Sequence, residues 1–373
     1  MEKFEKLQKF QEALKRGKLG KVESFELWLK THGFDPNKTN YEYVHNYYLK
    51  NPLELVNYEK ELEIIAEFIG FYLRDRSDIY HLPLLGVHGS GKTLLLNAVN
   101  SMLRISNEEV KVGKYDASLF SEIANEEEQY LFTVIDEITE DIDVVLLDSC
   151  DRDRLIDYSL RKISEKAGSC VYITSWSPEK WRYICNKVEE FLQTSKEIYI
   201  EPFEKEETVE LLKNLVTIMH DESGIIELGI QKSVYESVHD FSRGIPGISV
   251  KLFLNALKET FLKQKEVVDK ESVESAAKRM GLFGISEKLN ELSELHLQIL
   301  RLILLSYDER GIRPSELVET IGKNKATISY HLQTLRSEGF LEVERAGRSS
   351  FYRIKENIKP LIQLKISEEV EYG

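Results

Sequence analysis

Cysteine is scarce in this sequence and does not occur in pairs. The chain of 373 residues contains three cysteines, Cys150, Cys170 and Cys185, and none of them belongs to a C-x-x-C motif. An odd number of separated cysteines argues against both a zinc knuckle and a disulfide framework. The cysteine content therefore favours a reducing, cytoplasmic compartment.

Long apolar runs are missing as well. The sequence begins with the charged stretch MEKFEKLQKF, which does not resemble a signal peptide. No uninterrupted apolar segment approaches the roughly 20 residues that a transmembrane helix needs. We therefore expect a soluble protein with no membrane partner.

An excess of positive charge is also absent. The chain has 50 Lys and Arg residues against 64 Asp and Glu residues, which gives a formal net charge of -14. Contacts with nucleic-acid phosphates require clustered cations, so this composition excludes a protein that nucleic acid covers over its whole surface. Any contact with DNA must be confined to a local basic patch.

The sequence is long enough for several domains, because 373 residues exceed what one hydrophobic core usually organises. Helical apolar spacing in residues 2–18 and 24–32 predicts a helical start to the chain. We expect four parts, namely an N-terminal helical segment at residues 1–50, a nucleotide-binding domain at 51–203, a helical lid at 204–284 and a C-terminal domain at 285–373.

The apolar run Leu82–Val87 leads into a glycine-rich motif. Residues 86–93 read GVHGSGKT, which matches the P-loop pattern G-x-x-x-x-G-K-[ST] between a predicted strand and the helical segment TLLLNAVNSML. Backbone N–H groups of such a loop surround phosphate oxygens. A glycine turn that only connects two elements is the alternative. The residues expected at the phosphates are Gly86, Gly89, Ser90, Gly91, Lys92, Thr93 and Leu94.

Two residues of this motif have distinct expected roles. Lys92 reaches the β and γ phosphates, and the hydroxyl of Thr93 binds a magnesium ion. The motif therefore predicts a nucleoside triphosphate site, with ATP or ADP and Mg²⁺ as its ligands.

The segments after the P-loop predict an α/β fold. Strands expected at residues 143–147 and 170–174 each follow a helical pattern, which indicates βα units and the parallel sheet of a P-loop NTPase. From residue 204 to about residue 280 the strand signals stop and helical patterns take over, so we expect a small helical lid.

An acidic residue at a strand end is needed to hold the magnesium ion. Asp148 follows the apolar residues 144–147, whereas Asp136 and Glu137 follow another apolar run, Leu131–Ile135. Spacing favours Asp148, because one helix then separates its strand from the strand CVYIT. Thr174 and Ser175 end that next strand, where they either orient the attacking water or only cap the strand.

Residues 288–356 have the pattern of a winged helix-turn-helix. Pro314 opens one short helix, Gly322 and Lys323 form a turn, and Asn324 caps the next helix. Two alternating segments, FLEVE and SSFYRI, then predict the strands of a wing. The C-terminal domain is therefore expected to be a winged helix, similar to modules of the ArsR and MarR kind.

Positive charge is concentrated in this region. Residues 311–355 contain eight Lys and Arg residues against five Asp and Glu residues. Ile328, Leu332 and Leu335 recur on one face of the second helix, so the opposite face is free to enter a major groove. The predicted DNA contacts are Lys323, Lys325, Ser329, Tyr330, Gln333, Arg345 and Arg348. A protein-docking role for the module is the alternative.

From about Leu53 to Ile354 the chain resembles the AAA+ initiator clade, which includes bacterial replication initiators and archaeal origin-recognition/Cdc-type proteins. The segments DVVLLDSCD and VYITSWSP look like the Walker B and sensor 1 strands of that clade, and EPFEKEETVELLKNL looks like the start of its lid. The resemblance implies an ATP-controlled protein that binds double-stranded DNA in replication, as a monomer or a DNA-assembled oligomer, with a helicase or another replication protein as partner.

Two other families remain open. The sequence Gly244-Ile245-Pro246 is similar to the G-x-P signature of archaeal STAND-like signalling ATPases. A mobile-element ATPase whose winged helix docks a recombinase or helicase is the third possibility.

The chain departs from the initiator pattern at its catalytic positions. Ser149 stands where the clade has its Walker B glutamate, so Asp151 or Glu137 would have to substitute, and we expect slow ATP hydrolysis. Gly247 stands where the lid arginine is common, and Arg243 is the nearest replacement.

Overall fold

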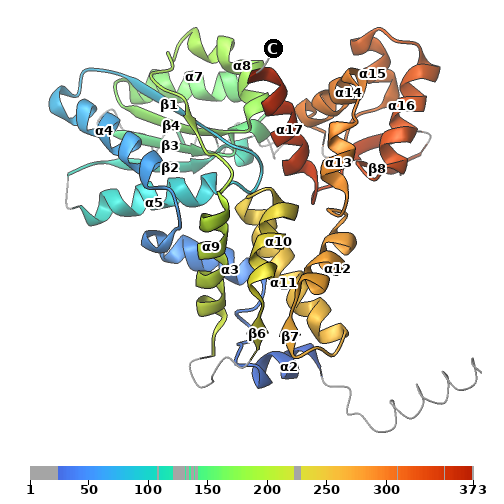
Figure 1. Cartoon of the computed structure of the whole chain (residues 1–373). Coiled ribbons are helices and arrows are strands. Elements are labelled where there is room, and N and C mark those ends of the chain that lie inside the picture. Colours follow the sequence, from blue (N-terminus) through green and yellow to red (C-terminus); the bar gives the residue numbers. More distant parts are fainter. Residues whose placement is uncertain are drawn as a thin grey trace, which may run out of the picture.

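The computed structural model describes residues 24–106, 109–120, 131, 134–135, 138, 142–221, 228–308, 310–347 and 349–371. A sheet with flanking helices, a set of lid helices and a smaller C-terminal module follow one another along the chain (Figure 1). The predicted helix at residues 2–18 lies outside the described residues.

A parallel sheet of five strands forms the centre of the region between the N-terminal elements and the lid. Its strand order is β2-β3-β4-β1-β5, and every described pairing in it is parallel. The strands are β1 (Tyr80–Leu85), β2 (Val112–Asp116), β3 (Val144–Asp148), β4 (Val171–Trp176) and β5 (Ile198–Tyr199). The sequence prediction of a P-loop NTPase sheet is confirmed, and β2 and β5 were not foreseen.

The central strands are apolar along their whole length because helices cover both faces of the sheet. Every residue of β3 and β4 is buried. In Figure 1, α7 and α8 lie on one face of the sheet and α5 lies on the other face. Helix α4 contacts α5 and the sheet strands β1 and β4. These helices are α4 (Glu59–Asp75), α5 (Lys92–Ile105), α7 (Ile156–Ala167) and α8 (Pro178–Glu189), with 3-10 turns at η2 (Ala117–Phe120) and η3 (Cys150–Arg152).

The N-terminal elements pack on the lid and beside the P-loop helix. Ser24 caps α2 (Phe25–Thr31) and Asn40 caps α3 (Tyr41–Lys50), each by accepting a backbone N–H. Trp28 lies with its ring centroid 5.9 Å from that of Phe261 in the lid. A 3-10 turn, η1 (Pro52–Glu54), then leads toward α4.

The lid contains a short sheet in addition to its helices. Its helices are α9 (Lys205–Met219), α10 (Lys232–Ser242), α11 (Pro246–Leu262) and α12 (Lys270–Met280). Gly229–Ile230 (β6) and Val267–Val268 (β7) pair in parallel, and this short sheet was not foreseen. Strands of two residues are too short to produce a detectable alternation of apolar and polar residues.

The C-terminal module is a winged helix, as predicted. After α13 (Ile285–Asn290) come α14 (Glu294–Leu305), α15 (Pro314–Ile321) and α16 (Lys325–Ser337), followed by the antiparallel strands β8 (Leu341–Ala346) and β9 (Ser349–Ile354). Pro314 opens α15, Gly322 ends it at a φ of 72°, and the Asn324 side chain accepts the N–H of Thr327.

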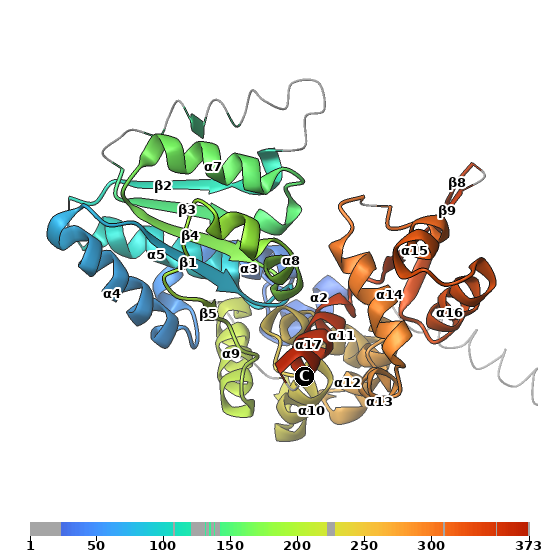
Figure 2. The same cartoon turned by 90° about the horizontal axis from the view of Figure 1, so that it is seen from above.

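A last helix, α17 (Lys359–Glu371), leaves the winged helix and returns to the sheet region. It lies between the two in both cartoon views, and it contacts α8 and α14 (Figures 1 and 2). Its residues Leu361, Ile362 and Ile366 are buried. The sequence analysis did not separate this helix from the winged helix.

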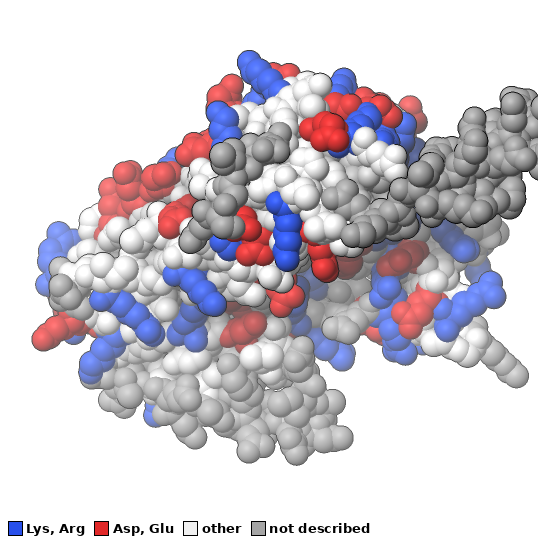
Figure 3. Space-filling model, turned by 90° about the horizontal axis from the view of Figure 1, so that it is seen from below, with Lys and Arg blue, Asp and Glu red and all other residues white. Residues whose placement is uncertain are grey.

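Charges of both signs are interspersed on the face of the molecule in Figure 3, where Lys and Arg alternate with Asp and Glu. None of the helices in the described part of the chain is long and apolar enough to cross a bilayer.

A histidine lies inside the sheet. His81 of β1 has no solvent exposure, its Nε2 lies 2.9 Å from Thr174 Oγ1, and its ring packs against Trp181. Burial lowers the pKa of His81 to about 3, because the protonated ring cannot be solvated there.

We expect His81 to make the fold acid-sensitive. In the unfolded chain its pKa is the ordinary 6.5, so the unfolded state binds a proton that the folded state excludes between pH 6.5 and about pH 3. Stability from this residue is full above pH 6.5 and falls as the pH decreases. Between pH 7 and pH 4.5 the unfolding free energy of the wild type should fall by about 2 to 3 kcal/mol more than that of His81→Leu in urea titrations. Equal losses would contradict this assignment.

Candidate functional site

The P-loop connects β1 to α5 and depends on two glycines with positive φ. Gly89 has a φ of 80° and Gly91 has a φ of 101°. A Cβ atom at Gly91 would collide with the hydroxyl of Tyr58, which itself donates a 2.7 Å hydrogen bond to the carbonyl of Ser90. Tyr58 therefore holds the loop against the start of α4 and leaves no room for a larger residue.

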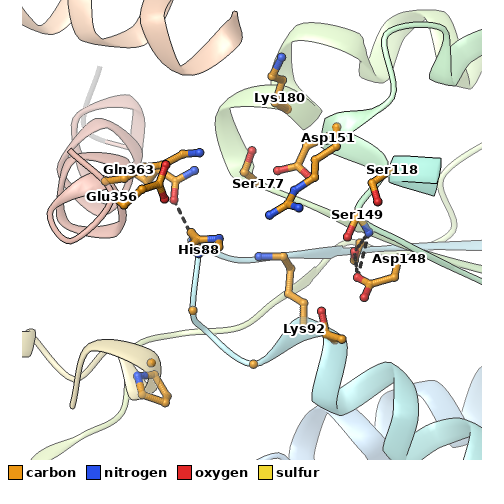
Figure 4. A pocket seen from close by; sticks show the side chains of 18 of the residues that line it. His88, Lys92, Ser118, Asp148, Ser149, Asp151, Ser177, Lys180, Glu356 and Gln363 are labelled. Carbon is orange, nitrogen blue, oxygen red and sulfur yellow. Dashed lines mark hydrogen bonds between the residues drawn. The ribbon is translucent and has the colours of Figure 1, made fainter. Parts of the chain in front are cut away.

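Lys92 lies inside the curve of the loop. Its Nζ donates to the carbonyl oxygens of Gly86 at 2.6 Å and Val87 at 3.0 Å. Burial lowers the pKa of Lys92, while the carboxylates of Asp151 and Asp148 act in the opposite direction. The charge of this lysine is thus directed to the space in front of the loop (Figure 4).

The loop fits a phosphate chain. A Cβ atom at Gly86 would lie 2.5 Å from Ser90 Oγ, so only glycine allows this close approach. Ser90 is buried, and its hydroxyl has no hydrogen-bond partner among the described residues. The loop opens into a cavity of about 1130 Å³, which Thr93, Leu94, Asp148 and lid residues also line. This volume is large enough for a nucleotide.

Asp148 ends β3 at the cavity and is held by its neighbours. Its Oδ1 accepts hydrogen bonds from Ser175 Oγ at 2.6 Å and from the N–H of Ser149 at 2.9 Å. The geometry thus joins two of the predicted site residues, Asp148 and Ser175. The described residues contain no group of three or more His, Cys, Asp or Glu side chains that could hold a metal ion. Asp148 and Thr93 both line the cavity.

The alternative acidic position does not follow a strand. Leu131, Val134 and Ile135 are helical, which contradicts a strand at Leu131–Ile135. Asp136 and Glu137 lie outside the described residues.

Thr174 is not brought into the site. Successive side chains of a strand point to opposite faces, and Thr174 points into the core, away from Ser175. Its hydroxyl lies 2.9 Å from His81 Nε2 and accepts a 2.7 Å hydrogen bond from Trp176 Nε1. Ser175 lines the cavity and Thr174 does not, so the expected role at an attacking water has no geometric support for Thr174.

The other two predicted catalytic residues have different positions. Asp151, in the turn after β3, lines the cavity. Arg243 ends α10 with a φ of 51°, and its guanidinium donates a 2.7 Å hydrogen bond to Glu368 of α17. In this structure Arg243 contacts the C-terminal helix and does not line the cavity.

Sequence reasoning missed the residues that join α17 to the P-loop. The side-chain carbonyl of Gln363 accepts a 2.7 Å hydrogen bond from the N–H of His88, which Figure 4 shows as a dashed line. The amide nitrogen of Gln363 donates a 2.6 Å hydrogen bond to Glu179 Oε1. No local motif marks these residues, because Gln363 is 275 residues from His88 along the chain.

A second contact joins the winged helix directly to α8. Lys180 donates a 2.6 Å hydrogen bond to the carbonyl of Leu305, and its ammonium lies 3.3 Å from the centre of the Tyr307 ring. Burial lowers the pKa of Lys180 to about 8. A buried lysine in contact with a carbonyl and an aromatic face fixes the end of α14 on the nucleotide-binding region.

The outer face of α16 is available for a groove. Ile328, Leu332 and Leu335 are fully buried, as predicted, while 66% of the Tyr330 surface is exposed. Of the other predicted contacts, Lys323, Lys325, Gln333 and Arg345 are exposed, Ser329 is half-buried, and Arg348 lies outside the described residues. The structure therefore places the described candidates on one helix, the turn before it and the wing.

Comparisons with known proteins agree with the winged helix. Residues 296–343 match the family model of the bacterial regulatory proteins of the arsR family. A search of curated proteins found no match. The prediction of an ArsR-like module is confirmed for this part of the chain.

Solved structures similar to the chain include AAA+ proteins. The ORC1 protein of Aeropyrum pernix in complex with DNA has a TM-score of 0.49 and 16% identity, over 85% of this chain and 93% of that chain. The Aeropyrum pernix ORC2 protein in ADPNP-ADP complexes has a TM-score of 0.46 and 16% identity, over 84% and 96%. A Thermotoga maritima RuvB variant has a TM-score of 0.46 and 16% identity, over 82% and 95%.

These structural neighbours include the origin-recognition proteins that the sequence resembles. All three TM-scores are below 0.5. The description of the fold therefore rests on the parallel sheet, the P-loop geometry and the winged helix of this chain.

We expect Lys92→Ala to abolish ATP binding. The substitution removes the ammonium expected to bind the phosphates. It should leave the fold intact, because the hydrogen bonds of this ammonium within the described part of the chain go to loop carbonyls. Binding of a fluorescent ATP analogue and thermal unfolding would be measured together, with the exposed Lys196→Ala as control. An affinity for ATP within about threefold of the wild type would refute the P-loop assignment.

Proposed function

We propose that the protein is an ATP-binding AAA+ protein that binds double-stranded DNA through its winged helix under the control of the bound nucleotide. The observation that carries this proposal is the direct connection between the two sites. Gln363 of α17 bonds the P-loop, and Lys180 of α8 bonds the end of α14 in the winged helix. A change in the loop is thereby transmitted to the DNA-binding module.

At the nucleotide site we propose ATP or ADP with Mg²⁺ as ligands. Lys92 would bind the β and γ phosphates, while Thr93 and Asp148 would bind the magnesium ion, which neutralises phosphate charge when bound. We propose that hydrolysis is slow, because Ser149 follows Asp148 where a carboxylate would otherwise face the attacking water.

In its biological setting the protein is proposed to act like a replication initiator, loading a helicase or another replication partner at DNA. The arsR-family match of residues 296–343 favours a second candidate, a transcription regulator controlled by a signalling ATPase site. A scaffold that docks a recombinase is the third candidate. Selection of bound genomic fragments in ATP and in ADP distinguishes them, since an initiator enriches a few origins, a regulator enriches promoters and a scaffold enriches neither.

The four-part division of the chain is proposed to describe its folding units, with one refinement. Because α17 packs against both α8 and α14, we propose that it acts as a connecting element between the nucleotide-binding domain and the winged helix.

We expect the cations of the turn, α16 and the wing to set the salt dependence of DNA binding. Lys325→Ala and Arg345→Ala should each weaken binding to all sequences and flatten the slope of log affinity against log salt by about one, as for the loss of one phosphate contact. Lys196→Ala, an exposed cation outside the module, serves as control. Unchanged slopes in both module variants would show that the winged helix binds a protein and not DNA.

Tyr330 is expected to act differently from these cations. Its exposed ring on α16 can meet a base edge or a thymine methyl group in the major groove. Tyr330→Ala should therefore reduce the discrimination between a selected fragment and random DNA by about 1 to 3 kcal/mol, with little change in the salt slope. Competition binding at two salt concentrations measures both quantities. A reduced slope with unchanged discrimination would place the ring at the backbone instead.

A further inference from the structure

A buried carboxyl group at the nucleotide cavity has no role in the function proposed so far. Glu179 lies in the first turn of α8, is 6% exposed and lines the same cavity as Lys92 and Asp148. Glutamate is almost never buried to this extent unless it is paired. The helix N-terminus favours its charge to a limited degree only.

The pairing of this carboxyl is incomplete. Oε1 accepts the 2.6 Å hydrogen bond from Gln363, whereas Oε2 has no partner within the part of the chain that the structure describes. The hydroxyl of Ser177 lies close enough to the carboxyl to lower its pKa, but neither Ser177 Oγ nor Glu179 Oε2 has a partner with hydrogen-bond geometry among the described residues. A buried acceptor that remains unpaired is destabilising, so a purely structural glutamate would be a poor choice here.

The carboxyl is close to the phosphate end of the P-loop. Its partner Gln363 also accepts the N–H of His88, which places Glu179 one side chain away from the loop. The carboxylate acts electrostatically on Lys92, the residue expected at the β and γ phosphates. Glu179 therefore lies at the part of the cavity that Lys92 and His88 border, which is where the γ phosphate of a bound nucleotide is expected.

We propose that Glu179 is the general base of ATP hydrolysis and that Gln363 is its positioning residue. This inference rests on the proposed ATP site. It assigns the acidic function that Ser149 cannot supply to a residue from the next strand-to-helix connection.

In the proposed step, each bond that forms or breaks and each proton of the water is accounted for. A water oxygen forms a bond to the γ phosphorus, and the bond from that phosphorus to the bridging oxygen breaks. The bridging oxygen leaves with the electron pair as part of ADP. One proton of the water passes to Glu179 Oε2 and then to solvent, and the other stays on the inorganic phosphate.

The surroundings of Glu179 suit a base. Burial raises the pKa of the carboxyl, and the hydrogen bond from Gln363 acts in the opposite direction. A raised pKa makes the carboxylate a better proton acceptor near neutral pH. The charged groups that face it are Lys92 from α5, Asp151 from the turn after β3 and Lys180 from its own helix.

Ser149 supplies no carboxylate at the end of β3. Its φ of 56° is a left-handed conformation that is unfavourable for any residue with a Cβ atom. Its N–H is used to hold Asp148 and Ser175 in place. The turn after β3 therefore holds Asp148, the proposed magnesium ligand, and α8 supplies the proposed general base.

The first test is Glu179→Gln in the full-length protein. The expected result is an ATP affinity within about threefold of wild type and a turnover reduced by about 10²-fold or more, since a general base contributes 10²- to 10⁴-fold. Glu189→Gln, an exposed glutamate on the same helix, should leave turnover unchanged. Wild-type turnover in Glu179→Gln would overturn the inference. So would a result in which Asp151→Asn loses turnover while Glu179→Gln keeps it.

The second test separates positioning from folding. Gln363→Met keeps the side-chain volume but removes the hydrogen bond that lowers the pKa of Glu179. Turnover requires the ionised carboxyl, so the acidic limb of its pH profile should move to higher pH while the plateau persists. Gln298→Met, an exposed glutamine of α14, is the matched control. An unshifted midpoint in a folded Gln363→Met variant would overturn the positioning role even if the variant is less stable.

Different results would contradict the proposed ATP site and the assignment of Glu179. If the wild type binds no ATP, the proposed function is wrong. If it binds ATP and Lys92→Ala does not, but the protein never hydrolyses ATP, the ATP site stands and the assignment of Glu179 is overturned.

Discussion

The side chain of Gln363 connects the P-loop, α8 and α17 through its two ends. A buried amide must satisfy both its carbonyl and its nitrogen, and here the N–H of His88 and the carboxyl of Glu179 do so. Helix α17 cannot leave its place without exposing both partners and breaking the Arg243–Glu368 contact. The position of the winged helix therefore depends on the same few atoms that border the nucleotide site.

The parts of the molecule with local signals were predictable from the sequence. The P-loop, the strand before Asp148 and the caps of α15 and α16 each depend on residues within about a dozen positions of one another, and all of these features are present. Periodicity also placed Ile328 and Leu332 in the core of the winged helix. Such features persist because backbone geometry and burial of one face constrain each of them separately.

The parts that depend on distant contacts were not predictable. Gln363 meets residues 275 and 184 positions away, so no spacing rule connects it to His88 or Glu179. Thr174 and Ser175 look equivalent in sequence, and only the pleat of β4 directs the first into the core. The two-residue strands of the lid leave no pattern at all. Long-range packing decided each of these cases.

The position of the winged helix matters because the rest of the chain carries the net negative charge. Residues 290–356 have ten Lys and Arg residues and ten Asp and Glu residues, so the remainder of the chain carries the whole net charge of -14. Under the proposed function, DNA bound by the wing would be repelled by that net negative charge within a Debye length, about 10 Å at 0.1 M salt. Gln363 of α17 and Lys180 hold the module beside the sheet region, so a nucleotide that released these contacts would change the proposed DNA affinity without altering any residue at the DNA. Such control would need no separate switch inside the winged helix.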